Sequence, residues 1–144
     1  MASHLARVFI AVAYVVALSF TSVVANDAMA KEQVVIQVSD DNPKTWNQAL
    51  NVARNIQKSY GGKDKVDIEM VVFGHGIGML KMDSVVGNRI DDAQKSGVHV
   101  NACMNTMRGQ KLVKEDMLPT IGYVPAGVIE VIKKQREGWA VIRP

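Results

Sequence analysis

The sequence has a single cysteine, Cys103, and this scarcity limits its chemistry more than any other feature of its composition. One cysteine cannot form an internal disulfide, and it cannot supply the paired thiolates of a zinc-binding motif. The Cys103 thiol is therefore free, bound to a small molecule, or bridged to another chain.

Aromatic residues and clustered cations are also scarce. Aromatics make up 6% of the chain, and no basic run is longer than the pair Lys133-Lys134. Nucleic-acid surfaces combine cationic patches with stacking aromatics, so we expect no nucleic-acid partner. The histidines, carboxylates and methionines show no spacing typical of metal ligands, so we expect neither a metal nor an organic cofactor.

Residues 1–30 have the order of regions found in secretory signal peptides. A positively charged start precedes an apolar run over residues 8–25, and the segment ending at Ala30 has the small-x-small spacing of a signal-peptidase site. We expect cleavage after Ala30 and export to the periplasm, which leaves residues 31–144 as one domain without a membrane segment. Cleavage after Ala25, or retention of the run as an anchor, are the alternatives.

The remaining chain alternates between strand-like and helix-like segments. Short β-branched or apolar runs predict five strands, at residues 34–39, 65–74, 98–103, 121–124 and 139–143. Helical spacing of apolar residues predicts four helices between them, with expected starts or centres at Asn42-Pro43, Asp83 or Ser84, Leu112 with Val113, and Pro125. Strict alternation predicts a three-layer α/β/α sandwich around a five-stranded, mostly parallel sheet.

Two loops follow predicted strands at the edge where ligands of parallel sheets bind. They are "GHGIG", residues 74–78, and "CMNTMRG", residues 103–109. Consecutive strands are usually neighbours in a sheet, so we expect these loops to face each other.

Cys103 lies where a strand gives way to a predicted helix that Asn105 or Thr106 can cap. A helix N-terminus stabilises a thiolate through its unpaired N–H groups and its dipole, and Arg108 adds positive charge. This interpretation gives a reactive thiol. The alternative is a buried, inert cysteine that packs as a small hydrophobic residue.

The glycine-rich loop supplies two further candidates for binding, His75 and Gly76. His75 can exchange a proton or contact an anion, or it is simply exposed on a tight turn. The glycines resemble a phosphate-binding loop, but their spacing differs from the dinucleotide pattern. His99, between two valines of the predicted third strand, is interpreted as structural.

The stretch "VHVNACMNTMRG", residues 98–109, resembles the segment around the active cysteine of the DsrE/DsrF/TusD-type sulfur-relay proteins. In that family a strand ending in Asn-x-Cys leads into a helix that carries Arg-Gly. The segments at 71–80 and 118–144 are similar to an exported, DsrE-like branch, so the likeness covers nearly all of residues 33–144. It implies a five-stranded α/β sandwich that assembles into homo-oligomers, as trimers or hexamers.

The resemblance also implies a role for the thiol. Cys103 would accept sulfur as a persulfide and pass it on, with a protein or a small thiol as donor and acceptor. Asn101, Asn105 and Arg108 would be neighbours of the thiol.

Three hypotheses for function follow. The first is a periplasmic sulfur carrier that works through Cys103. The second is a non-catalytic module that binds a small anion through "GHGIG" and the backbone N–H groups after the third strand, with a structural Cys103. The third is a redox sensor in which Cys103 forms an intersubunit disulfide or a sulfenic acid.

Overall fold

The structure is a computed structural model that describes residues 30–144, so the predicted signal peptide lies outside the described residues except for Ala30. The described chain contains five strands, which are β1 (Glu32–Val38), β2 (Val66–Val72), β3 (Val98–Cys103), β4 (Gly122–Val124) and β5 (Ala140–Ile142). Its α-helices are α2 (Pro43–Tyr60), α3 (Gly87–Lys95), α4 (Met104–Gly109) and α5 (Gly127–Arg136). Two 3-10 helices, η1 (Gly74–Leu80) and η2 (Lys114–Asp116), complete the fold.

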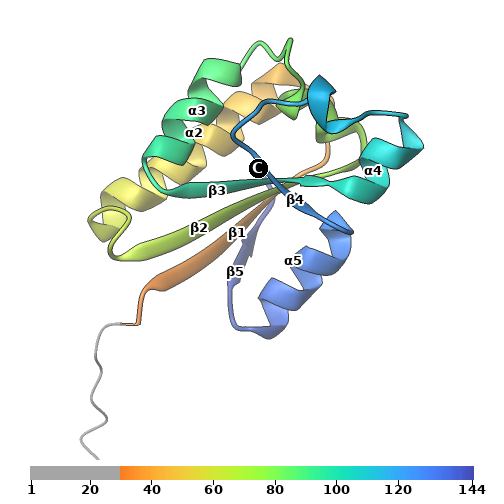
Figure 1. Cartoon of the computed structure of the whole chain (residues 1–144). Helices are drawn as coiled ribbons and strands as arrows, with labels where there is room; N and C mark the ends of the chain where they lie inside the picture. Colours follow the sequence, from red (N-terminus) through yellow and green to blue (C-terminus); the bar gives the residue numbers. More distant parts are fainter. Residues whose placement is uncertain (1–29) are drawn as a thin grey trace, which may run out of the picture.

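The strands form one sheet in the order β4-β3-β2-β1-β5, and every neighbouring pair is parallel. Helices α2 and α3 cover one face, and α5 lies on the opposite face (Figure 1). The predicted α/β sandwich around a five-stranded parallel sheet is confirmed. Among residues 30–144, no helix is long and apolar enough to cross a membrane.

Helix α2 forms as its sequence predicts. The Asn42 side chain accepts a hydrogen bond from the Lys44 N–H at 2.9 Å, and Pro43 takes the first helical position. Gly61 ends the helix with φ +92°, a left-handed conformation that glycine adopts without steric cost. The apolar side of the helix, which includes Trp46 and Leu50, is buried against the sheet.

The predicted start of the second helix is wrong. Helix α3 begins at Gly87 after Val86, and no side chain caps it. Asp83 and Ser84 precede it in a turn, where the Ser84 hydroxyl accepts from the Val86 N–H at 3.4 Å. These polar residues therefore close a turn and do not cap the helix.

Two other helix boundaries differ from expectation. Helix α4 follows β3 without a loop, so Leu112 and Val113 lie beyond its end. Helix α5 begins at Gly127, two residues after Pro125. The residue before α5 is Ala126, which offers no side-chain cap. The first turn of α5 therefore has backbone N–H groups available for another partner.

The core has two parts, one on each face of the sheet. The larger one packs α2 and α3 against residues such as Ile36 and Ile68. The smaller one lies under α5 and contains Val35, Val71 and Val131. Helix α5 lies over β1, β2 and β5, so this face of β3 is open and His99 is exposed on it. His99 was interpreted as structural, but its side chain is exposed and no helix covers it among the described residues.

Candidate functional site

Cys103 is both the last residue of β3 and the N-cap of α4. Its sulfur accepts a hydrogen bond from the backbone N–H of Thr106, three residues on, at 3.4 Å. A second bond, at 3.2 Å, comes from the N–H of Gly127, the first residue of α5. Cys103 thus takes the capping role expected of Asn105 or Thr106, and that expectation is wrong.

The position of Cys103 follows from the topology of the sheet. The strand β3 leads into α4, whose Met107 joins the core on the α2/α3 face. The neighbouring strand β4 leads into α5, whose Val131 packs on the opposite face. Connections that leave adjacent strands toward opposite faces open a crevice at the carboxyl edge, which is where parallel sheets bind ligands. The Cys103 sulfur lies at this switch point.

The two edge loops contact each other, as the sequence predicts. The Gly74 N–H donates to the Thr106 hydroxyl oxygen at 2.9 Å, and the Gln110 side chain donates to the Gly74 carbonyl at 3.2 Å. Gly76 packs against the end of β1, where an added Cβ would meet the Val38 carbonyl oxygen at 2.9 Å. The backbone of the glycine-rich segment therefore holds the Thr106 side chain in place through the hydrogen bond from Gly74.

The environment of Cys103 favours its thiolate. Burial raises the pKa of the thiol, but hydrogen bonds from the Thr106 hydroxyl and from the N–H groups of Gly127, Thr106 and Asn105 outweigh burial. The net pKa is below the ordinary value. A lowered pKa at a buried thiol requires donors aimed at the sulfur, and two separate segments supply them here.

The sulfur is also well covered, because only 4% of the Cys103 surface is exposed. Phe73 lies against the start of α5, where an added Cβ on Gly127 would meet the Phe73 Cβ at 2.9 Å. Access to the sulfur in this conformation is therefore restricted to small molecules or depends on movement of the surrounding side chains.

The other candidate site residues predicted from the sequence lie in three separate places. Asn105 and Arg108 are exposed on α4 and bonded to each other at 2.9 Å. His75 is exposed at the mouth of a hollow of about 410 Å³ that Asp41, Trp46, Lys81 and Gln110 also line. Neither Asn105 nor Arg108 has a side-chain contact with the sulfur among the hydrogen bonds of the described residues.

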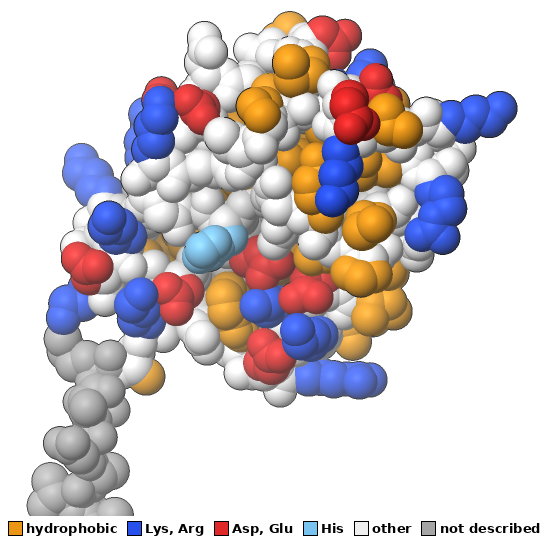
Figure 2. Space-filling view, viewed as in Figure 1, with side chains coloured by type: hydrophobic (Ala, Val, Ile, Leu, Met, Phe, Trp, Pro, Cys, Tyr) orange, Lys and Arg blue, Asp and Glu red, His pale blue; other side chains and the backbone are white. Residues whose placement is uncertain are grey.

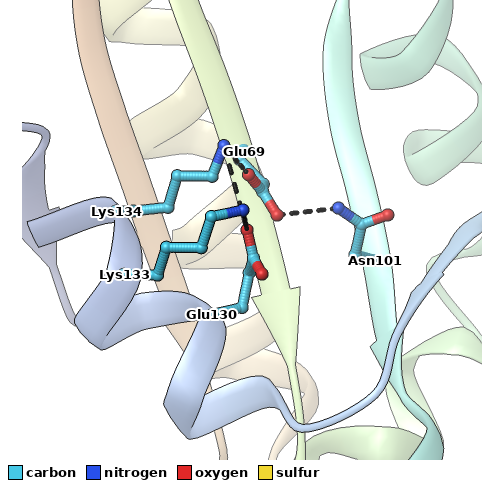
Figure 3. A network of polar contacts seen from close by, with 5 residues as sticks. All are labelled: Glu69, Asn101, Glu130, Lys133 and Lys134. Carbon is cyan, nitrogen blue, oxygen red and sulfur yellow. Dashed lines mark hydrogen bonds and ion pairs between the residues drawn. The ribbon is translucent and has the colours of Figure 1, made fainter. Parts of the chain in front are cut away.

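Asn101 belongs to a different arrangement on the face under α5. Its amide donates to the Glu69 carboxylate at 2.8 Å, and the same carboxylate pairs with Lys134 of α5 at 3.0 Å (Figure 3). Glu69 is 5% exposed, so this is a buried ion pair. Within residues 30–144, no group of three or more His, Cys, Asp or Glu side chains is placed to hold a metal ion.

Sequence reasoning missed Gly127, Glu69 and Lys134. Gly127 was visible in the sequence as a glycine near the start of a predicted helix. A residue with a side chain is normally tolerated there, so a glycine indicates close packing. The reason for it is the contact with Phe73, which depends on tertiary structure. Glu69 was visible as an acidic residue between the apolar residues Ile68 and Met70, a pattern that indicates a buried partner.

No family model matches the sequence, and no curated protein is similar to it. Three solved structures share its fold and are covered over their full length. The protein of unknown function MTH1491 from Methanobacterium thermoautotrophicum is 29% identical over 79% of this chain, with a TM-score of 0.75. The conserved protein of unknown function BT1422 from Bacteroides thetaiotaomicron is 18% identical over 83%, with a TM-score of 0.66.

The third structure is the ychN protein from E. coli, which is 9% identical over 80% of this chain with a TM-score of 0.63. The comparisons therefore show the fold of this chain, an α/β fold around a five-stranded parallel sheet, which is the fold that the resemblance of the sequence implies.

Proposed function

We propose that this chain is an exported, DsrE-like protein that handles sulfur, with Cys103 as the thiol that carries a persulfide. The observation that carries the proposal is the pair of hydrogen bonds from Thr106 and Gly127 to the sulfur, at 3.4 and 3.2 Å. They stabilise the anionic form of the thiol, and the thiolate is the form that attacks sulfur.

The transfer is a displacement between sulfur atoms. The Cys103 thiolate attacks the outer sulfur of a donor hydropersulfide, a new S–S bond forms, and the S–S bond of the donor breaks. The donor leaves as a thiolate with the bonding electron pair and is protonated by water. An acceptor thiolate then takes the outer sulfur and releases the Cys103 thiolate. No electrons are gained or lost overall, and no metal or organic cofactor takes part.

The burial of Cys103 limits which sulfur donors can reach its thiol. With 4% of its surface exposed, the residue is poorly placed for a broad protein surface to reach the sulfur directly. We therefore favour a small hydropersulfide as the donor or a small thiol as the acceptor. A partner protein would have to present a thin, extended segment.

Mass spectrometry tests the proposal. The purified protein is incubated with glutathione persulfide, and the peptide that contains Cys103 is examined for a mass gain of one sulfur atom. We expect this gain in the wild type, its loss after addition of a small thiol, and no gain in Cys103→Ser. A wild type that stays unmodified, while the donor is shown to be intact, contradicts the proposal.

The burial of Cys103 also supports the second hypothesis, a binding module with a structural cysteine. The N–H groups of Thr106 and Gly127 are already bonded to the sulfur, so they are not free for an anion. A ligand would instead occupy the hollow beside His75, which is lined by groups of both charges. If Cys103→Ser keeps every binding property of the wild type, this second hypothesis is favoured. The redox-sensor hypothesis has less support, because an intersubunit disulfide requires an exposed sulfur.

Export and self-association are parts of the proposal. Cleavage after Ala30 would leave Lys31 at the N-terminus of the exported protein, which N-terminal sequencing can establish. Exposed apolar side chains on α5, namely Val128, Ile129 and Ile132, support association into homo-oligomers. Figure 2 shows hydrophobic side chains gathered on the side of the molecule that carries α4 and α5.

A further inference from the structure

Helix α5 is attached to the sheet at two places, to β3 at the start of the helix and to β2 near its end. At its first residue, the Gly127 N–H donates to the Cys103 sulfur at 3.2 Å. Near its other end, Lys134 pairs with Glu69 at 3.0 Å, and Glu69 accepts from Asn101 at 2.8 Å. Asn101 and Cys103 are two residues apart on β3 and therefore point to the same face of the sheet.

The second attachment is well shielded from water. The side chains of Lys134 and Glu69 are 16% and 7% exposed, and the Lys134 ammonium lies 4.2 Å from the centre of the Trp139 ring. Burial lowers the pKa of Lys134, but its contact with Glu69, together with the nearby charges of Glu130 and Glu137, outweighs burial and keeps the pKa above the ordinary value. Lys134 also lies 3.9 Å from Glu130, but Glu130 belongs to α5 itself, so Glu69 is the partner that ties Lys134 to the sheet (Figure 3).

We propose that Glu69 and Lys134 are positioning residues for Cys103, because they fix α5 on the sheet and so hold the Gly127 N–H against the sulfur. This inference rests on the proposed function, in which the Cys103 thiolate reacts. Lys134 is seven residues from Gly127, or about two helical turns, so its effect on the thiol is transmitted by the placement of the helix.

The sign of the effect separates positioning from simple electrostatics. Glu69→Gln removes a negative charge from the face of Cys103, and electrostatics alone would lower the pKa of the thiol. Positioning predicts the opposite result, because Lys134 loses its partner, α5 moves, and the Gly127 hydrogen bond weakens. Lys134→Met removes a positive charge, and both effects then raise the pKa of the thiol. A rise in both variants is therefore the signature of positioning.

The chain offers a matched control for the lost charge. Lys133 precedes Lys134 on α5, is 59% exposed and, among the residues that the structure describes, forms an ion pair with Glu130 alone, at 3.7 Å. Lys133→Met removes the same charge from the neighbouring residue but leaves the ion pair between Lys134 and Glu69 intact. We expect it to leave the Cys103 titration close to that of the wild type. Lys134→Arg keeps a cation that can pair with Glu69 and stack on Trp139, so the titration of Cys103 in this variant should match that of the wild type.

The experiment is a pH titration of Cys103 in the wild type and these variants, read by alkylation rate and by the NMR shift of the Cβ of isotope-labelled Cys103. We expect the pKa in Glu69→Gln and Lys134→Met to rise by about one unit, which leaves roughly tenfold less thiolate below the pKa. Each remaining thiolate is more nucleophilic, so alkylation at neutral pH should slow by only about threefold to fourfold. Circular dichroism confirms that each variant is folded.

A Glu69→Gln titration that is unchanged, or displaced to lower pH, overturns the inference. If Glu69→Gln does not fold, the double variant Glu69→Gln/Lys134→Met removes both charges together and is expected to show the same rise. The NMR titration does not require a reagent to reach the sulfur. A wild type that takes up no persulfide therefore defeats the proposed function, while the NMR titrations still decide the positioning role.

Discussion

The Cys103 sulfur and the Gly127 backbone nitrogen are 3.2 Å apart, although 24 residues separate them in the chain. Gly127 begins α5, whereas Cys103 ends β3 and caps α4. The state of the thiol is therefore set by the packing of two helices on opposite faces of the sheet. Each part of this arrangement can be altered separately, which gives the predictions below.

Thr106→Val should raise the pKa of Cys103 and slow its alkylation at neutral pH. The variant keeps the shape of the side chain but removes the hydroxyl that favours the thiolate and accepts from the Gly74 N–H. Loss of this acceptor should also lower the free energy of unfolding by about 1–3 kcal/mol. Alkylation as a function of pH and denaturant unfolding measure the two effects. Thr120→Val, at an exposed site bonded to Gln94, is the control and should change neither. An unchanged thiol titration in Thr106→Val would exclude this role of the hydroxyl.

Gly127→Ala should lower the free energy of unfolding and raise the pKa of the Cys103 thiol. The added Cβ would meet the Phe73 Cβ at 2.9 Å, so either Phe73 or the start of α5 must move. Overpacking of this kind costs about 1–3 kcal/mol, and displacement of α5 lengthens the bond from Gly127 to the Cys103 sulfur. We expect a lower midpoint of unfolding and a higher pKa of the thiol.

Gly109→Ala is the matched control for this change. An added Cβ at Gly109 has no atom within 4 Å, and the residue lies in the last turn of α4. Alanine is favoured over glycine in a helix, so stability should be unchanged or slightly higher. A Gly127→Ala protein as stable and as reactive as Gly109→Ala would show that the start of α5 is not tightly held.

Much of the fold could be predicted from the sequence, because local signals and packing agree. The five apolar runs became the five strands, and Asn42 and Pro43 begin α2 as predicted. The errors occurred where the chain bends without a regular cap. Ser84 closes a turn, and α3 starts from Val86 with no side-chain cap, because its position is set by burial of residues such as Ile90.

The site was less predictable because its donors come from tertiary contacts. The sequence placed Cys103 at a strand–helix junction, and the local bond from Thr106 follows from that position. The bond from Gly127 depends on how α5 crosses the sheet, and the Glu69–Lys134 pair depends on the register of α5 against β2. Neither has a signature in the spacing of nearby residues. Asn101 was nominated as a neighbour of the thiol, but its amide is bonded to Glu69.

Ile129→Lys should reduce self-association without unfolding the protein. Ile129 is 60% exposed on α5 beside Val128 and Ile132, so a charge there costs little in the monomer but is unfavourable in an apolar interface. Light scattering during size-exclusion chromatography measures the mass of the wild type and of the variant. Val85→Lys places the same charge at a residue that is 77% exposed and precedes α3, and it should leave the mass unchanged. A wild type that is monomeric at all concentrations would refute self-association.

The lowered pKa of Cys103 should make stability depend on pH in a defined direction. In the unfolded chain the thiol titrates at about 8.5, and in the folded protein it titrates at lower pH. Between the two values the unfolded state binds more protons, so the free energy of unfolding rises with pH. The contribution is complete above the unfolded pKa and is lost as pH falls through the folded pKa. Denaturant unfolding of the wild type and of Cys103→Ser at several pH values isolates this term, because other groups titrate alike in both proteins. The stability difference should shift in favour of the wild type as pH rises toward 8.5 and then level off. A difference that is constant with pH would mean that Cys103 has the same pKa in the folded and unfolded states, and its hydrogen bonds would then not favour the thiolate.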